Sequence, residues 1–210
     1  MAISVGNSTY TAQDNANSIT VSAPSGIEDG DVLVLRVTAW DTISGLSWPS
    51  GFSGVSTTYD AAAVKEASSE SGSYEVTVSS GGLMVATLTV IKGADVSSKV
   101  WSNTDYTTNN TTLRAAGITV GAGACLVWMA GIYLNGTITN PSGFTTQVGT
   151  GDAYYGDIRL QTATKLGLSS GATGDIDGTM SAATTYKHVI MLGLDPAAEA
   201  STFCPRVVLL

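Results

Sequence analysis

The chain has 210 residues, of which 43% are hydrophobic and only 12% charged, with 24 glycines and a formal net charge of −8 at pH 7. This composition is too apolar for a disordered chain and too rich in Ser, Thr and Gly for a helical one, so we expect a folded β-protein. The acidic balance argues against a nucleic-acid partner, because binding to phosphates draws on clustered Lys and Arg, of which the chain has nine.

Short segments of strand-forming residues follow one another along the chain and are separated by Gly, Asn, Asp and Pro, as in a sandwich or jelly roll. We expect strands at residues 8–11, 18–23, 31–40, 53–58, 62–67, 72–78 and 83–91 in the first half, and at 117–120, 124–134, 145–148, 158–166, 174–180 and 186–194 in the second. The polar stretch at 97–113 is expected to link the two halves.

The second half of the chain repeats features of the first. Ile-Thr-Val occurs at 19–21 and again at 118–120, and Pro-Ser-Gly-Phe occurs at 49–52 and at 141–144. Residues 59–69 include good helix formers. Their counterpart in the second half, residues 158–165, alternates between apolar and polar side chains and is rich in β-formers. The repeat therefore favours a strand in both places.

These features predict an all-β fold, an antiparallel β-sandwich or jelly roll built from two pseudo-repeats that share one core. The single domain should span residues 1–198, with the repeats at about 8–98 and 117–198. Residues 199–210 fall outside the repeat and are expected to form a C-terminal arm. Its apolar side chains would need cover, so we expect these residues to contact a partner: Phe203, Val207, Val208, Leu209 and Leu210.

The apolar run at residues 124–132 is far shorter than the roughly 18 to 20 residues that span a bilayer, so it predicts a strand buried on both faces rather than a membrane segment. The first residues carry neither a basic segment nor a sustained apolar one, so no secretory signal is expected. Cys125 lies in the apolar run and is expected to be a buried apolar side chain. Cys204 lies in the arm, and a disulfide between the two cysteines stays an open alternative.

Side chains suited to catalysis are few. The one histidine, His188, is expected on the rim or on a partly buried face of a strand, and the chain has no G-x-S-x-G motif to supply a nucleophile. One His and two distant Cys do not make a zinc site. Four carboxylates that could pair as in a glycosidase each lie beside a glycine, which favours structural turns: Asp152, Asp157, Asp175 and Asp177. We therefore expect a non-enzymatic protein without catalytic, cofactor-binding or metal-binding residues.

The aromatic residues fall into two groups. Trp40, Phe52 and Phe144 occupy repeated positions and are expected to be core anchors. The second group lies in or near loops with Asn, Asp and Gly. We expect it either to form a contact surface for protein or carbohydrate, or to cover the end of the sandwich: Trp48, Trp101, Tyr106, Tyr154 and Tyr155.

Four segments together resemble a known family: Gly-Asp-Val-Leu-Val at 30–34, the Pro-Ser-Gly-Phe turn, residues 65–74, and Gly-Leu-Asp-Pro-Ala at 193–197. They are similar to a jelly-roll family found among tailed-bacteriophage virion structural proteins and prophage genes. The resemblance covers nearly the whole chain up to residue 198, with Phe52 standing where family members often carry Trp.

The resemblance implies a virion component made in the host cytoplasm. We expect a capsid decoration (cement) protein that binds the major capsid protein, copies of itself, or both, as a trimer or another symmetric homo-oligomer. The alternative is a tail or head-fibre module that binds a host receptor or a carbohydrate. A glycosidase or esterase is the least favoured class, and neither nucleic acid nor a membrane is an expected partner.

Overall fold

The computed structural model describes residues 2–40, 42–105, 108–133, 136–151 and 158–198, and these residues are almost entirely β-structure. The first half forms β1 (Ser4–Ser22), β2 (Val32–Ala39), β3 (Ser53–Ser56), β4 (Asp60–Glu66) and β5 (Ser73–Lys92). A 3₁₀ turn, η1 (Val96–Ser98), precedes the second half. There the strands are β6 (Val100–Asp105), β7 (Asn110–Ala115), β8 (Thr119–Val120), β9 (Ala124–Tyr133), β10 (Ile138–Thr139), β11 (Thr145–Gly151), β12 (Ile158–Leu168), β13 (Gly171–Ala172), β14 (Ile176–Thr184) and β15 (Lys187–Leu194). The expected all-β class is confirmed.

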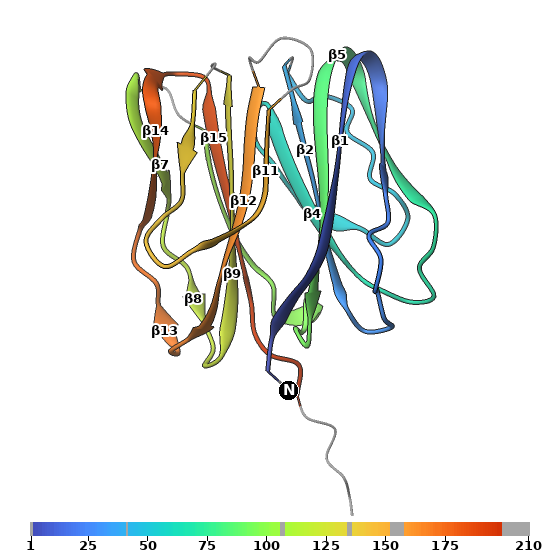
Figure 1. Ribbon diagram of the computed structural model, residues 1–210, viewed down its shortest axis with the longest axis vertical. Helices are drawn as coiled ribbons and strands as arrows, with labels where there is room; N and C mark the ends of the chain where they lie inside the picture. The colour runs from blue at the N-terminus through green and yellow to red at the C-terminus, as the bar shows by residue number, and fades with distance from the viewer. Residues whose placement is uncertain (1, 41, 106–107, 134–135, 152–157, 199–210) are drawn as a thin grey trace, which may run out of the picture.

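Each half of the chain contributes one five-stranded sheet. The strand order is β1-β5-β2-β4-β3 in the first sheet and β11-β12-β9-β15-β6 in the second. Every pairing is antiparallel. In the second half, β10, β14 and β7 form a further three-stranded sheet, and β13 pairs with β8. Figure 1 shows the strands of the two halves as two groups that stand side by side.

Two sequence-based expectations are settled by the strand positions. Residues 60–66 form β4 within the segment that local propensity left open, so the strand prediction from the repeat is confirmed. Residues 97–113 were expected as the link between the halves, but they also include most of η1, all of β6 and the beginning of β7. Among the described strands, β6 pairs with β15 alone, at the edge of its sheet, and an edge strand with one solvated side accommodates polar residues.

The hydrophobic core has a layer inside each half and a third layer between them. The inner layers include Leu35 and Leu88 in the first half and Trp128 and Leu113 in the second. The central layer draws from both halves, with Val32, Val34, Val64 and Ile91 from the first and Val127, Met129, Ile190 and Leu192 from the second. β2, β9 and β15 are therefore buried along their whole length. Their near-continuous apolar runs are typical of strands that pack on both faces, which confirms the expectation for residues 124–132.

The repeated tetrapeptide Pro-Ser-Gly-Phe forms the same turn in both halves. In each turn the phenylalanine N–H donates to the proline carbonyl oxygen at 3.2 Å. The glycine has a φ of 85° in the first turn and 78° in the second, a conformation that glycine adopts at least cost. A lysine covers each phenylalanine, with Lys65 Nζ 5.9 Å from the Phe52 ring and Lys165 Nζ 6.0 Å from the Phe144 ring. Both phenylalanines pack against the layer inside their own half, as expected of core anchors.

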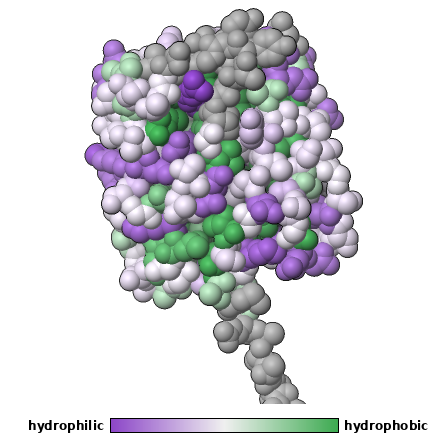
Figure 2. Space-filling view, in the orientation of Figure 1, coloured by the Kyte–Doolittle hydropathy of each residue, from purple (hydrophilic) through white to green (hydrophobic). Residues whose placement is uncertain are grey.

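The outer surface is mixed in character. Figure 2 shows hydrophilic and weakly polar residues over most of one face, with hydrophobic residues gathered toward its lower part. Within the part of the chain that the structure describes, the exposed large hydrophobic side chains are Tyr10, Trp40, Val100, Leu166 and Tyr186.

The first half expressed alone, as residues 1–98, should not unfold as a cooperative monomer. Its side of the central layer would face water, and each such Val or Ile side chain forfeits about 1.5 to 3 kcal/mol of burial. We expect aggregation or a broad transition in sedimentation and thermal melting, whereas the full chain melts cooperatively under the same conditions. A monomeric fragment with a sharp transition would contradict this.

Candidate functional site

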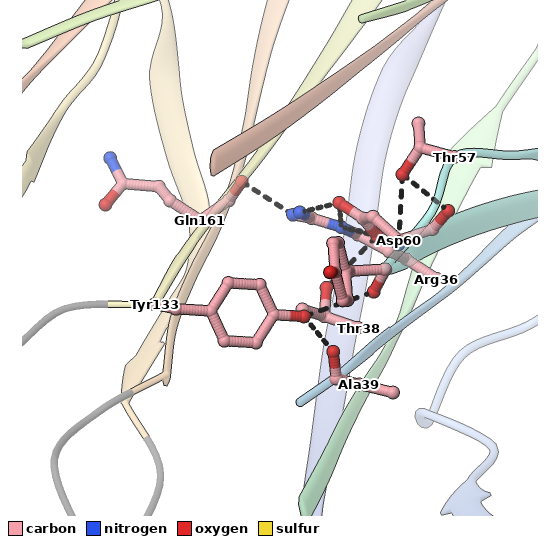
Figure 3. A network of polar contacts seen from close by, with 8 residues as sticks. Arg36, Thr38, Ala39, Thr57, Asp60, Tyr133 and Gln161 are labelled. Carbon is pink, nitrogen blue, oxygen red and sulfur yellow. Dashed lines mark hydrogen bonds and ion pairs between the residues drawn. The ribbon is translucent and has the colours of Figure 1, made fainter. Parts of the chain in front are cut away.

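A buried ion pair joins the two halves beside the central layer. Arg36 from β2 and Asp60 from β4 both have fully buried side chains. Arg36 Nε donates to Asp60 Oδ1 at 3.0 Å, and Nη2 contacts Oδ2 of the same carboxylate. Arg36 Nη1 donates at 3.1 Å to the backbone carbonyl oxygen of Gln161, which lies in β12 of the second half. The guanidinium therefore bridges both halves, as Figure 3 shows.

Strand pairing explains how these groups meet. Thr38 lies directly opposite Asp60 in the β2–β4 pair, and its hydroxyl donates to Asp60 Oδ1 at 3.0 Å. Arg36 is two residues earlier on β2, and alternate residues of a strand share a face. Across the interface, Gly131 leaves room for the guanidinium, because a Cβ there would lie 3.0 Å from Arg36 Nη2. The buried charges thus have several partners each, which a pair taken out of water requires.

Aromatic rings from both halves meet beside the ion pair. The Tyr133 ring lies 5.4 Å from the Trp40 ring and 5.6 Å from the Tyr59 ring, edge to face in both cases. The His188 ring lies 5.1 Å from Tyr59 and 6.0 Å from Tyr133. The Tyr133 hydroxyl donates to the carbonyl oxygens of Ala39 and Tyr59. This aromatic cluster therefore ties the end of β9 to the ends of β2 and β4.

The cluster forms the wall of a pocket of about 360 Å³, lined among the described residues by Trp40, Thr42, Tyr59, Tyr133 and Tyr186. Trp40 is 46% exposed and Tyr186 is 58% exposed, so two large rings offer surface to a ligand. The volume lies in the range of about 300 to 1,000 Å³ that is typical of small-molecule sites. Aromatic rings next to hydroxyl groups suit a ligand with both an apolar face and hydrogen-bonding groups.

The structure corrects the expectations for Trp40 and His188. Trp40 was expected to anchor the core, which is wrong: it follows the last residue of β2, beyond the buried part of the strand, and forms the half-exposed pocket wall. His188 is 2% exposed, so it lies inside the aromatic cluster rather than on a rim. The reason is its place on β15, which is buried along its whole length.

The loop aromatics do not come together as one surface. Trp48 packs against the layer inside the first half, and Trp101 packs against the central layer. Tyr106, Tyr154 and Tyr155 lie outside the described residues. The tyrosines that do line the pocket were not predicted from the sequence, although Tyr59, Tyr133 and Tyr186 each stand at or next to the end of a strand. An aromatic residue at the end of a buried strand is the signal that could have found them.

Two of the four candidate carboxylates, Asp175 and Asp177, lie within the described residues, and both have structural hydrogen-bond partners. Arg114 donates to Asp177 through Nε at 2.7 Å and through Nη2 at 2.6 Å, and its hydrogen bonds hold the pKa of Asp177 below the ordinary value. Asp175 accepts the N–H of Gly117 at 3.1 Å. Asp177 lies within β14 rather than in the expected turn, because it pairs directly with Arg114 on β7. Asp152 and Asp157 lie outside the described residues.

Cys125 is fully buried, as expected, and burial raises the pKa of its thiol to about 12. Cys204 lies outside the described residues, as do the proposed arm contacts: Phe203, Val207, Val208, Leu209 and Leu210. Within the described ranges, no cluster of three or more His, Cys, Asp or Glu side chains could hold a metal ion. The same part of the chain has no helix that is long and apolar enough to cross a membrane.

Comparison of the chain with protein-family models, with curated proteins and with solved structures gives no match.

Substitutions at the buried ion pair should change the free energy of unfolding by different amounts. Asp60→Ala should lower the free energy of unfolding by about 3 to 5 kcal/mol, because it leaves the Arg36 guanidinium buried without its carboxylate. The double variant Arg36→Met, Asp60→Leu should lose much less, since it removes both charges together. As a control, Asp177→Ala removes an exposed pair and should cost less than about 1 kcal/mol. Urea unfolding measures all three, and a double variant as unstable as Asp60→Ala would refute the expectation.

Proposed function

We propose that this protein is a non-enzymatic structural component of a bacteriophage virion, a capsid decoration (cement) protein that binds and stabilises the shell. The observation that carries the proposal is the central layer, in which two five-stranded sheets pack through an apolar cluster and a buried ion pair. Such a layer makes the two halves a rigid unit, because close-packed protein interiors have low compressibility. A protein that reinforces a shell needs this rigidity, and the resemblance to virion structural proteins points the same way.

The buried polar groups make contacts within the fold, which supports the non-enzymatic part of the proposal. Arg36 and Asp60 satisfy each other and neighbouring backbone groups. His188 packs against two tyrosine rings. These groups hold the fold together, which is a different task from activating a nucleophile or a water molecule.

The partners in this proposal are the major capsid protein and other copies of the chain, in a trimer or another symmetric oligomer. One surface suited to such a contact is a hollow of about 490 Å³ where β1 meets β11 and β12, lined by Val5, Gly143, Thr145, Gln147, Thr164, Lys165 and Leu166. The C-terminal arm at 199–210 is the second candidate, on the sequence argument alone.

Quantitative mass spectrometry of intact virions tests the role. A decoration protein should be present at a copy number commensurate with the capsid lattice, because each copy occupies a repeated position on the shell. Far fewer copies than lattice positions, found in tail fractions, would refute the capsid assignment and favour the tail alternative.

The arm is tested separately with particles stripped of the protein. A chain lacking residues 201–210 should keep its thermal transition and bind such particles more weakly than the full chain. Each buried aliphatic side chain of the arm would contribute about 1.5 to 3 kcal/mol before the cost of ordering. Equal binding by both chains would remove the arm from the proposal.

The second candidate function is carbohydrate binding by a tail or head-fibre module, and the aromatic pocket favours it. Trp40 and Tyr186 are half-exposed aromatic residues of the type that stacks on the C–H face of a sugar, and Thr42 adds a hydroxyl group. The pocket is shared between the two halves, so the intact fold is needed to form it.

A panel of neutral oligosaccharides tests this candidate by titration calorimetry. Trp40→Ala should weaken any sugar bound by about fivefold or more, since a central aromatic contact contributes more than about 1 kcal/mol. Tyr10→Ala is the matched control, because Tyr10 is 59% exposed on β1 and does not line the pocket. Binding that both variants retain would place the sugar elsewhere, and no binding by the unmodified chain would dismiss the candidate.

A further inference from the structure

Inside the second half, a buried lysine contacts an asparagine on another sheet. Lys187 is the first residue of β15 and is fully buried. Its Nζ donates to the backbone carbonyl oxygen of Asn110 at 2.7 Å and also contacts Asn110 Oδ1. Asn110 is the first residue of β7. Because β15 belongs to the five-stranded sheet and β7 to the three-stranded sheet, the contact spans the layer between them.

The surroundings favour reaction between the two side chains. Burial lowers the pKa of Lys187, which increases the share of the neutral amine, the form that acts as a nucleophile. Asn110 Oδ1 also accepts the backbone N–H of Thr112 at 2.9 Å. That N–H draws electron density from the amide carbon and would stabilise negative charge on the oxygen during an attack, as an oxyanion hole does.

We propose that Lys187 and Asn110 form an intramolecular isopeptide bond between β15 and β7. Nζ of Lys187 attacks Cγ of Asn110, and the bond between Cγ and Nδ2 breaks. A proton from the attacking nitrogen passes to the departing nitrogen, which leaves as ammonia. The step is an exchange of one amide for another and needs neither an oxidant nor a reductant. It occurs once per chain, so a slow rate is sufficient.

The position of this bond gives it a mechanical consequence. β7 and β15 lie in different sheets, so the bond would tie those sheets together covalently. A cross-link between distant residues stabilises chiefly by restricting the unfolded chain, and it also persists when the non-covalent packing is pulled apart. The inference stands on the contacts of two side chains and does not depend on the virion role.

The mass of the intact, purified chain tests the bond. We expect a mass below that of the sequence by one molecule of ammonia, and a branched peptide joining the segments around residues 110 and 187 after digestion. A folded chain with the full sequence mass and no branched peptide would overturn the proposal.

Three variants separate the bond from other losses of ammonia, such as a cyclic imide at Asn110. Lys187→Arg and Asn110→Ala should each have their full sequence mass, whereas the matched control Asn109→Ala should still lose ammonia. A loss that persists in Lys187→Arg would assign it to the asparagine alone and refute the cross-link. Should either variant fail to fold, the branched peptide of the unmodified chain still decides the question.

Discussion

The burial of one arginine between the halves is the constraint on which the rest of the structure depends. A guanidinium removed from water is costly unless its donors are satisfied. The Asp60 carboxylate accepts a hydrogen bond from Arg36 Nε. The backbone carbonyl oxygen of Gln161, in the other half, accepts a hydrogen bond from Arg36 Nη1. We infer that the pair fixes the register between the two sheets, because a shift of β12 by one residue would take that carbonyl away. The apolar side chains of the central layer supply most of the hydrophobic stabilisation between the halves. Because this stabilisation is not directional, it fixes the relative position of the sheets far less than the hydrogen bonds of Arg36 do.

The aromatic pocket depends on the same arrangement. Its wall includes Tyr133 from the second half and Trp40 and Tyr59 from the first. The Tyr133 hydroxyl bonds to carbonyl oxygens at Ala39 and Tyr59, so the ring is held by the strand ends that the ion pair aligns. A pocket built in this way has a shape set by how the halves meet, and its rings are preorganised before any ligand arrives.

The elements were more predictable from the sequence than their contacts. A continuous apolar run identified β9 as a buried strand, strand-forming residues identified β2 as a strand, and the comparison of the halves decided for a strand at β4, where local propensity alone was ambiguous. The polar strand β6 escaped detection because an edge strand needs no apolar pattern. Tyr59, Tyr133 and Tyr186 lie far apart in the sequence and meet only through sheet packing. No local signal encodes that proximity, and the same is true of the Lys187 and Asn110 contact.

The shared central layer also constrains how the sequence can vary over time. Val34 and Val64 belong to the same buried cluster as Met129 and Ile190 of the other half, and close packing leaves little free volume for a larger neighbour. A gain in volume on one side must therefore be met by a loss on the other, so substitutions there should be inherited as compensating sets. Among the described residues, the inner layer of one half does not pack against the inner layer of the other, so substitutions in the two inner layers need not compensate each other. The sequence of each inner layer can therefore vary independently, whereas the residues on the two sides of the central layer have to change together.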